Sequence, residues 1–333
     1  MSNYLIEEAG QLDQNKIFPL LARSHFGPYR NLSLKSGAEL QQYWVKKITD
    51  SAQKGNSKAF MVERNNKLIG FIQAADLDWD SRIFGIPMCS IQELIVDANE
   101  PNRDEIIRGL LSIVLDWSRK QDYRFILAKT YTNDIHSIHA LEQAGFLLVD
   151  TLLFYEVNFQ KTPFSSIPIQ ERSKDVIIRM AEPKDEAELK LLAKAAFKKH
   201  FGRYHSDPKL TNEQATQVYV EWINSSIHGY ADYFSVAEVD GKIAGLTIWK
   251  ESSELEKEFS INVIHHSLAA IHPDFFGRRL YTLLTYEGMK LFDGNSDIIE
   301  SATHINNYPV QRGFNRLGWQ IHDARHSFHK WLD

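Results

Sequence analysis

A cation-rich turn separates two apolar segments in the second half of the chain. His272–Leu284 reads HPDFFGRRLYTLL, in which one glycine, Gly277, is followed by Arg278 and Arg279. A helix start offers free N–H groups and the positive end of its dipole, and a glycine lets the backbone approach a ligand closely. Guanidinium groups can pair with phosphate oxygens. The stretch predicts a phosphate-binding turn between a strand and a helix; the alternative is a solvated arginine pair at an ordinary helix start.

The segments around this turn belong to a repeat that runs through both halves of the chain. HFGPY begins at His25 and HFGRY begins at His200, an offset of 175 residues. Glycine pairs keep nearly the same spacing: Gly70 matches Gly245 at an offset of 175, and Gly145 matches Gly318 at 173. The halves therefore differ in length at one place, where residues 97–109 correspond to 272–282. Agreement of apolar, glycine and turn positions over both halves predicts a duplicated domain.

Each copy shows the same order of predicted elements. Helical patterns come first, then two strands across a turn, a third strand, a long helix, a fourth strand, a short helix and a last strand that completes the copy. The strands are expected at residues 59–63, 68–75, 89–96, 123–130 and 152–159, and again at 233–239, 243–249, 261–271, 296–303 and 324–332. This order predicts the α/β class, with a mixed sheet flanked by helices.

Domain boundaries follow from the repeat and from composition. The expected domains are residues 1–160 and 176–333, and residues 161–175 contain the prolines and serines of a linker. A chain of 333 residues exceeds what one hydrophobic core usually serves, which agrees with two domains. The composition, 43% hydrophobic and 24% charged, is that of a globular protein.

Hydropathy, net charge and the Cys and His content argue against several classes of function. No apolar run approaches ~18 residues and the N-terminus has no signal-peptide layout, so no membrane partner is expected and the cytoplasm is the expected location. The net charge of −5 with scattered basic residues argues against nucleic acid. Cys89 is the only cysteine, and the 13 histidines show no HExxH spacing, so no metal is expected.

The order of elements resembles the GCN5-related N-acetyltransferase (GNAT) superfamily, twice over and across nearly the whole chain. Three passages more closely resemble nucleotide-sugar N-acetyltransferases of the dTDP-fucosamine acetyltransferase type: Leu77–Pro87 (LDWDSRIFGIP), Phe201–Ile223 and His326–Leu332 (HSFHKWL). The resemblance implies a strand that splays from its neighbour to admit acetyl-CoA, and a turn whose N–H groups bind the pyrophosphate. It implies acetyl-CoA as co-substrate.

The two copies differ in the residues that the family uses to bind acetyl-CoA. The turn of the first copy, Asp97–Glu105 (DANEPNRDE), has no glycine and four acidic residues, so this copy is expected to be degenerate, with a structural or acceptor-binding role. By resemblance the second copy is the acetyl-CoA-binding domain. The residues expected to contact the cofactor are Ala270, Ile271, Gly277, Arg278, Arg279, Leu280, Asn307 and Phe314. Asn307 lies eleven residues before Gly318 and is alternatively a helix cap.

The tyrosine that many family members use as an acid is missing from both copies. Phe314 and Leu141 stand at that position. His304, at the end of the fourth main strand of the second copy, is the expected catalytic base, because a histidine with a pKa of ~6.5 can take a proton from an ammonium group. Tyr308 is expected to donate its O–H. His265 and His266 also approach the site, on opposite faces of their strand.

By resemblance the acceptor is the amine of a dTDP-linked amino-6-deoxy sugar used in bacterial surface polysaccharide synthesis. Such a substrate needs cations for its diphosphate and rings for its base. The residues expected to supply them are Trp79, Arg82, Arg203, Tyr204 and His205. Two alternatives stay open: an acetyltransferase acting on another small-molecule or protein amine, and a non-catalytic ligand-binding module that kept the fold.

Overall fold

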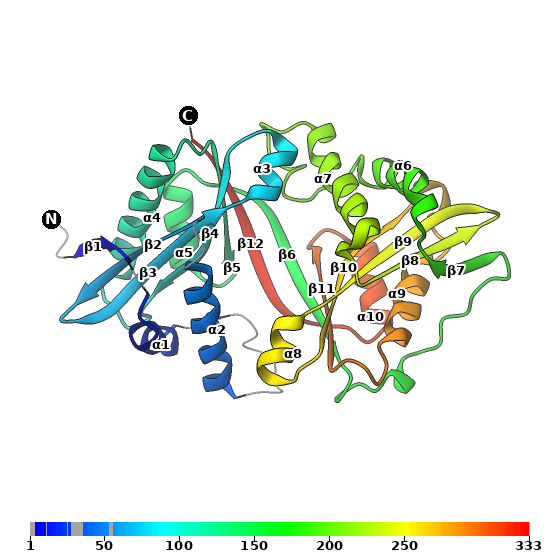
Figure 1. Cartoon of the computed structure of the whole chain (residues 1–333), viewed down its shortest axis with the longest axis horizontal. Coiled ribbons are helices and arrows are strands. Elements are labelled where there is room, and N and C mark those ends of the chain that lie inside the picture. Colours follow the sequence, from blue (N-terminus) through cyan, green and yellow to red (C-terminus); the bar gives the residue numbers. More distant parts are fainter. Residues whose placement is uncertain (1–3, 11, 25, 28–35, 53–55, 333) are drawn as a thin grey trace. The chain divides into compact units, whose positions relative to one another are not determined.

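The computed structural model describes residues 4–10, 12–24, 26–27, 36–52 and 56–332, and shows an α/β protein with two compact units (Figure 1). The first unit contains Met1–Asp150 and Arg325–Asp333, and the second contains Thr151–Ala324. Each unit holds a mixed sheet with helices on both faces. The predicted fold class is therefore confirmed.

In the first unit the strands lie in the order β1-β2-β3-β4-β5-β12. The elements are β1 (Leu5–Glu8), α1 (Gln14–Ala22), α2 (Gly37–Ala52), β2 (Ser57–Arg64), β3 (Lys67–Asp76), α3 (Asp78–Phe84), β4 (Met88–Val96), α4 (Arg103–Lys120), β5 (Phe125–Tyr131), α5 (Ile135–Gln143) and the end of β12 (Gln320–Trp331). Helices α4 and α5 cover one face around Leu110 and Val114, and α1 and α2 cover the other around Trp44 and Ile48.

In the second unit the order is β6-β11-β10-β9-β8-β7. Its elements are β6 (Leu147–Asn158), η1 (Phe164–Ser166), β7 (Val176–Met180), η2 (Pro183–Asp185), α6 (Glu186–Phe197), α7 (Asn212–Ser225), η3 (Ser226–Tyr230), β8 (Tyr233–Val239), β9 (Lys242–Glu251), α8 (Ser253–Phe259), β10 (Val263–Ile271), η4 (Pro273–Phe275), α9 (Leu280–Leu291), β11 (Ile298–His304) and α10 (Tyr308–Arg316). Helices α6 and α7 pack on one face, and α9 and α10 pack on the other.

The last strands of the two sequence repeats are exchanged. Leu152–Asn158 of β6 pairs with β11 in the second unit, and Arg325–Trp331 of β12 pairs with β5 in the first. The expectation that each last strand completes its own copy is corrected by this pairing. Alternating apolar residues predict that a segment is a strand, but its neighbour is chosen by tertiary packing, which the pattern does not encode.

The predicted hairpin turns are confirmed at the start of each sheet. Asn65 and Asn66, between β2 and β3, both adopt positive φ, as do Asp240 and Gly241 between β8 and β9. Consecutive positive φ angles characterise two-residue hairpin turns, where Asn, Asp and Gly are favoured. In the first copy of the repeated motif, His25, Pro28 and Tyr29 lie outside the described residues. Among the described residues, no helix is long and apolar enough to cross a membrane.

Candidate active site

Strands β10 and β11 separate part way along their length in the second unit. Their parallel pairing joins Val263–His265 to Ile298–Glu300, although β10 continues to Ile271 and β11 to His304. On its other side β10 has a bulge, because Trp249 pairs with His266 while the next residue, Ile248, pairs with Leu268. Ser267 is the extra residue, and a bulge leaves such a residue outside the ladder. The separation therefore frees backbone N–H and C=O groups for an extended ligand.

The cation-rich turn joins this separated strand to α9. Gly277 has φ +82°, and a Cβ atom there would meet nothing within 4 Å. Arg279 occupies the N-cap position with φ +59°, and no side chain caps the first turn of α9. The N–H groups at the start of α9 are therefore open to an anion from outside the helix. Arg278 forms an ion pair with Asp175, so the chain itself supplies a carboxylate to one of the two cations.

The other expected cofactor contacts are mostly buried. Ala270 and Leu280 belong to the apolar core, and Ile271 packs its tip close to Gly245. Phe314 is only 1% exposed and stacks on Trp319 at a centroid distance of 4.5 Å. A ligand can use the backbone of these segments, but the ring of Phe314 lies in the core rather than at an open surface.

Three residues expected to act together lie at the end of β11. The Asn306 amide donates to His304 Nδ1 at 3.0 Å, so this nitrogen must be the acceptor in the neutral imidazole. Asn307 sits at the N-cap of α10 but its side chain does not cap the helix; Nδ2 donates instead to Thr303 Oγ1 at 3.0 Å. Tyr308 is 57% exposed at the first residue of the helix.

The loop after α6 brings an aromatic cluster to the same strand end. Phe201 packs edge-on against His304 with centroids 4.9 Å apart, and stacks on His200. Burial lowers the pKa of His200 to about 4, with contributions from His205 and His304. His200 is therefore neutral at physiological pH and acts as a packing group beside His304. The structure thus brings the HFGRY motif to the predicted catalytic histidine.

The expected acceptor residues in this loop differ in accessibility. Tyr204 is 3% exposed, with the Arg203 guanidinium 4.5 Å from its ring centroid, and His205 Nε2 lies 3.3 Å from Thr216 Oγ1. The buried face of Tyr204 is not an open stacking surface for a base. Arg203 and His205 are half-buried and stay closer to solvent.

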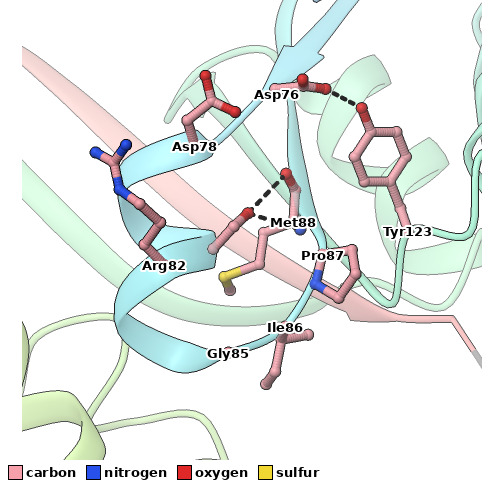
Figure 2. A pocket seen from close by; sticks show the side chains of 9 residues that line it. Asp76, Asp78, Arg82, Gly85, Ile86, Pro87, Met88 and Tyr123 are labelled. Atoms are coloured by element: carbon pink, nitrogen blue, oxygen red, sulfur yellow. Dashed lines mark hydrogen bonds between the residues drawn. The ribbon is translucent and has the colours of Figure 1, made fainter.

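The remaining acceptor candidates lie on α3 of the first unit. Trp79 is half-buried and Arg82 is exposed. Arg82 lines a pocket of ≈ 520 Å³ together with Asp76 and Tyr123, whose hydroxyl donates to the Asp76 carboxylate (Figure 2). Burial raises the pKa of Asp76, and the nearby Asp78 adds to this effect. The expected acceptor residues are thus divided between the two compact units: Arg82 belongs to the first and Arg203 to the second.

The acidic turn of the first unit is internally neutralised. Asp97 is buried and accepts from Arg23 Nε at 2.5 Å and from Lys67 Nζ at 3.0 Å, while Glu100 pairs with Arg64. Both carboxylates are therefore held in ion pairs within the unit and have a structural role. The turn that corresponds to the cation-rich turn is thereby closed by its own ion pairs.

One polar pair at the separation was missed by the sequence reasoning. His265 Nδ1 lies 2.7 Å from Glu300 Oε1, and the two residues are register partners in β10 and β11. His266 points the other way into the aromatic core, where burial lowers its pKa to about 3. The predicted opposite orientation of these two histidines is confirmed. Glu300 was the missed partner, because strand register cannot be read from either segment alone.

Within the described parts of the chain, no group of three or more His, Cys, Asp or Glu side chains is arranged to hold a metal ion.

Comparisons with known proteins agree with this geometry. Residues 18–146 match the acetyltransferase (GNAT) family. The chain is 22% identical over 272 residues, 80% of its length and 86% of the relative, to the spore coat polysaccharide biosynthesis protein SpsD of Bacillus subtilis (strain 168).

Two solved structures share the fold over nearly the whole chain. A GCN5-related N-acetyltransferase from Sphaerobacter thermophilus has a TM-score of 0.65 at 14% identity, with 99% of this chain and 96% of that chain covered. A tandem GNAT protein from the clavulanic acid biosynthesis pathway has a TM-score of 0.61 at 13% identity, with 99% and 98% covered. Residues 18–146 thus form a GNAT acetyltransferase domain, and the whole chain shares the fold of the tandem GNAT structure.

Proposed function

We propose that the second unit binds acetyl-CoA and transfers its acetyl group to the amine of a dTDP-linked amino-6-deoxy sugar. The observation that carries the first part is the combination of separated strands and an uncapped helix start at one end of β10. The pyrophosphate would receive the N–H groups of the Gly277–Leu280 turn together with the exposed Arg279. The pantetheine arm would then run along β10 toward the bulge at Ser267.

The residues present fit the co-substrate in charge and in space. Gly277 leaves open room above the turn, and Leu280 anchors the start of α9 in the core so that its N–H groups are held in place. A bulge next to the separation offers backbone N–H groups to the thioester carbonyl, where negative charge develops during attack. Acetyl-CoA supplies the activated acetyl group, and the thiolate leaves readily because the thiol pKa is ~8.5.

The choice of acceptor rests on the polysaccharide relative and on the passages that resemble nucleotide-sugar enzymes. SpsD is described as a spore coat polysaccharide biosynthesis protein, and its match covers most of both chains. Arg203 and His205 of the second unit are the half-buried polar side chains of the loop that reaches His304. They are the proposed contacts for the diphosphate. Arg82 and Trp79 stay proposed acceptor contacts of the first unit.

Calorimetry with acetyl-CoA tests the binding site. R279E should weaken binding by about tenfold or more, since it replaces a phosphate-pairing cation by an anion at the helix start. K290E is the matched control: it makes the same charge reversal in the last turn of the same helix. Equal losses in both variants would show a general charge effect and contradict the proposed site.

A transfer assay tests the acceptor. The protein is incubated with acetyl-CoA and dTDP-4-amino-4,6-dideoxy sugars, glucosamine, spermidine or a lysine peptide, and both thiol release and the N-acetyl product are measured. Preferred turnover of a dTDP-amino sugar supports the proposal. Preferred turnover of another amine contradicts the acceptor, and acetyl-CoA binding without any transfer supports a ligand-binding module.

A further inference from the structure

His265 and Glu300 form the last registered pair of β10 and β11 before the strands separate. Their side chains lie 2.7 Å apart between Nδ1 and Oε1, and they are 33% and 17% exposed. An imidazole at this position is one residue from the bulge neighbour His266 and two residues from Ser267. The pair therefore stands at the point where the proposed thioester site begins, and solvent reaches it.

The close contact with Glu300 constrains how the imidazole presents its second nitrogen. A carboxylate oxygen can only accept, so the 2.7 Å contact favours the tautomer with the proton on His265 Nδ1. In the neutral ring this leaves a lone pair on Nε2, and no described residue hydrogen-bonds that atom. Histidine oriented by a carboxylate through Nδ1, with Nε2 available, is an arrangement suited to proton abstraction.

Two further charged residues are register partners of the pair on the neighbouring strands. Lys250, the partner of His265 on β9, forms an ion pair with Asp232 at 3.0 Å. On the far side Glu156 is the partner of Glu300 on β6. Burial raises the pKa of Glu156, opposed by His322 and reinforced by the Glu300 charge. Glu300 is thus the group in direct contact with the imidazole, whereas the neighbouring charges act on it from a distance.

The histidine expected from the sequence is less suited to the same task. His304 Nδ1 accepts the Asn306 amide, so its lone pair is used by the backbone. Its other nitrogen carries the proton in the neutral ring and cannot accept one. The two histidines therefore offer opposite tautomers, and the lone pair without a described partner belongs to His265.

We propose that His265 is the general base of the acetyl transfer and that Glu300 is its positioning residue; this rests on the proposed acetyl-CoA site. As the amine nitrogen bonds to the acetyl carbon, Nε2 takes one N–H proton. The carbon–sulfur bond breaks, the imidazolium returns the proton to the departing thiolate, and CoA leaves as the thiol. The products are the amide and free CoA, with the imidazole regenerated.

The corresponding pair in the first unit has no such chemistry. Ser90 and Leu127 occupy the same register in β4 and β5. They match His265 and Glu300 at the offsets of 175 and 173 that relate the two copies. The pair is therefore a feature of the second copy and not a requirement of the fold.

Kinetics of three variants test the roles, with the panel amine that wild-type protein acetylates fastest. H265Q should lower kcat about 10²- to 10⁴-fold, while acetyl-CoA affinity stays within twofold. E300Q should lower kcat about tenfold, also with acetyl-CoA affinity within twofold of wild type. H304Q should lose less kcat than H265Q. A loss of kcat below about tenfold in H265Q, or a larger loss in H304Q than in H265Q, would overturn the proposal.

Two further measurements separate this proposal from the proposed function. Added imidazole should restore part of the activity of H265A, which a merely structural role would not allow. Nitrogen NMR of the free protein should show neutral His265 with its proton on Nδ1, even if no amine in the panel is acetylated. A proton on Nε2 would refute the base assignment, whereas the correct tautomer with no turnover would refute only the proposed acceptor or reaction.

Discussion

The two units use the same turn between a strand and a long helix in opposite ways. In the first unit, Asp97 at the end of β4 is buried between Arg23 and Lys67. In the second unit, the turn exposes Arg279 and pairs only Arg278 with a carboxylate, that of Asp175. A turn whose charges are satisfied internally is a structural joint, whereas a turn with an exposed cation at a helix start is suited to an external anion.

The short helices α5 and α10, which correspond to each other in the two copies, also differ at their first turn. Asp134 at the N-cap of α5 accepts from the Ser137 amide and from Arg103, at 3.4 and 3.1 Å. Asn307, its counterpart in the second unit, leaves the start of α10 without a side-chain cap. At this short helix, unit 1 caps the helix start with its own side chain, and unit 2 leaves it without a side-chain cap.

The family match covers residues 18–146, the half whose turn is closed. A family pattern is dominated by apolar periodicity and turn positions, which the fold needs in both copies. A match to the family model therefore does not show whether either copy binds acetyl-CoA. Local charge distinguishes the two turns, since both α4 and α9 start without a side-chain cap.

The largest expected effect comes from removing the buried anion of the first unit. D97A should lower the free energy of unfolding by about 3 kcal/mol, because two cations lose their shared partner. H272A changes the matching residue of the second unit and should cost less than about 1 kcal/mol, since His272 is only half-buried. Urea unfolding of both variants measures the difference, and equal costs would break the contrast between a closed and an open turn.

The pH dependence of D97A has a definite sign. Burial alone would raise the pKa of Asp97, but the Asn99 amide and the two cations outweigh it and hold the pKa below its ordinary value. A lowered carboxyl pKa contributes stability above the unfolded pKa of ~3.9 that is lost as the pH falls through the folded value. The deficit of D97A should therefore be full at pH 7 and shrink below about pH 4.

A second carboxyl of the first unit, that of Glu93, has its pKa shifted upward rather than downward. Burial raises the pKa of Glu93 to about 7, although the Trp44 indole donates to it at 2.9 Å and Arg325 and Lys47 oppose the shift. Because the folded state holds this proton more tightly, the favourable contribution is complete below ~4.3 and is lost as the pH rises to about 7.

The variant E93Q should remove the loss of stability that wild type shows as the pH rises to about 7. Gln keeps an acceptor for the Trp44 indole, so at pH 8 the variant should be more stable than wild type by on the order of 1–3 kcal/mol. Thermal unfolding from pH 4 to pH 8 measures the slope. L268Q, at the corresponding position of the second unit, should only destabilise, because Leu268 is buried. An unchanged slope in E93Q would contradict the assigned titration.

Sequence patterns predicted the main strands, the hairpin turns and the repeat, because these depend on local apolar periodicity and on Asn, Asp and Gly at positive φ. Helices α3 and α8 and the edge strands β1 and β7 were missed, since segments of four to seven residues carry few periods. The strand exchange and the His265–Glu300 contact depend on which strands become neighbours. Tertiary packing decides that choice, and a single copy of the pattern does not encode it.

Gly277 offers a smaller test of the open turn. G277A should cost about 1 kcal/mol of stability, because φ +82° strains a residue with a Cβ although the space is empty. If the turn binds the pyrophosphate, the added methyl group should also weaken acetyl-CoA binding by about threefold to tenfold. G294A is the matched control, with φ +76° and equally open space beyond the other end of α9. It should show the same loss of stability with unchanged affinity, and weaker binding in both would remove the turn from the site.

The smallest expected effect concerns the carboxylate that already occupies part of the turn. The Arg278 guanidinium lowers the pKa of Asp175, so the aspartate is ionised at neutral pH and competes with a phosphate for that cation. D175A should therefore tighten acetyl-CoA binding by about twofold to fivefold, with a larger gain at low salt because both groups are exposed. E171A removes one charge from the same linker without touching the turn. Tighter binding in D175A alone would identify Asp175 as an internal competitor, whereas weaker binding would mean that the ion pair holds Arg278 in place for the phosphate.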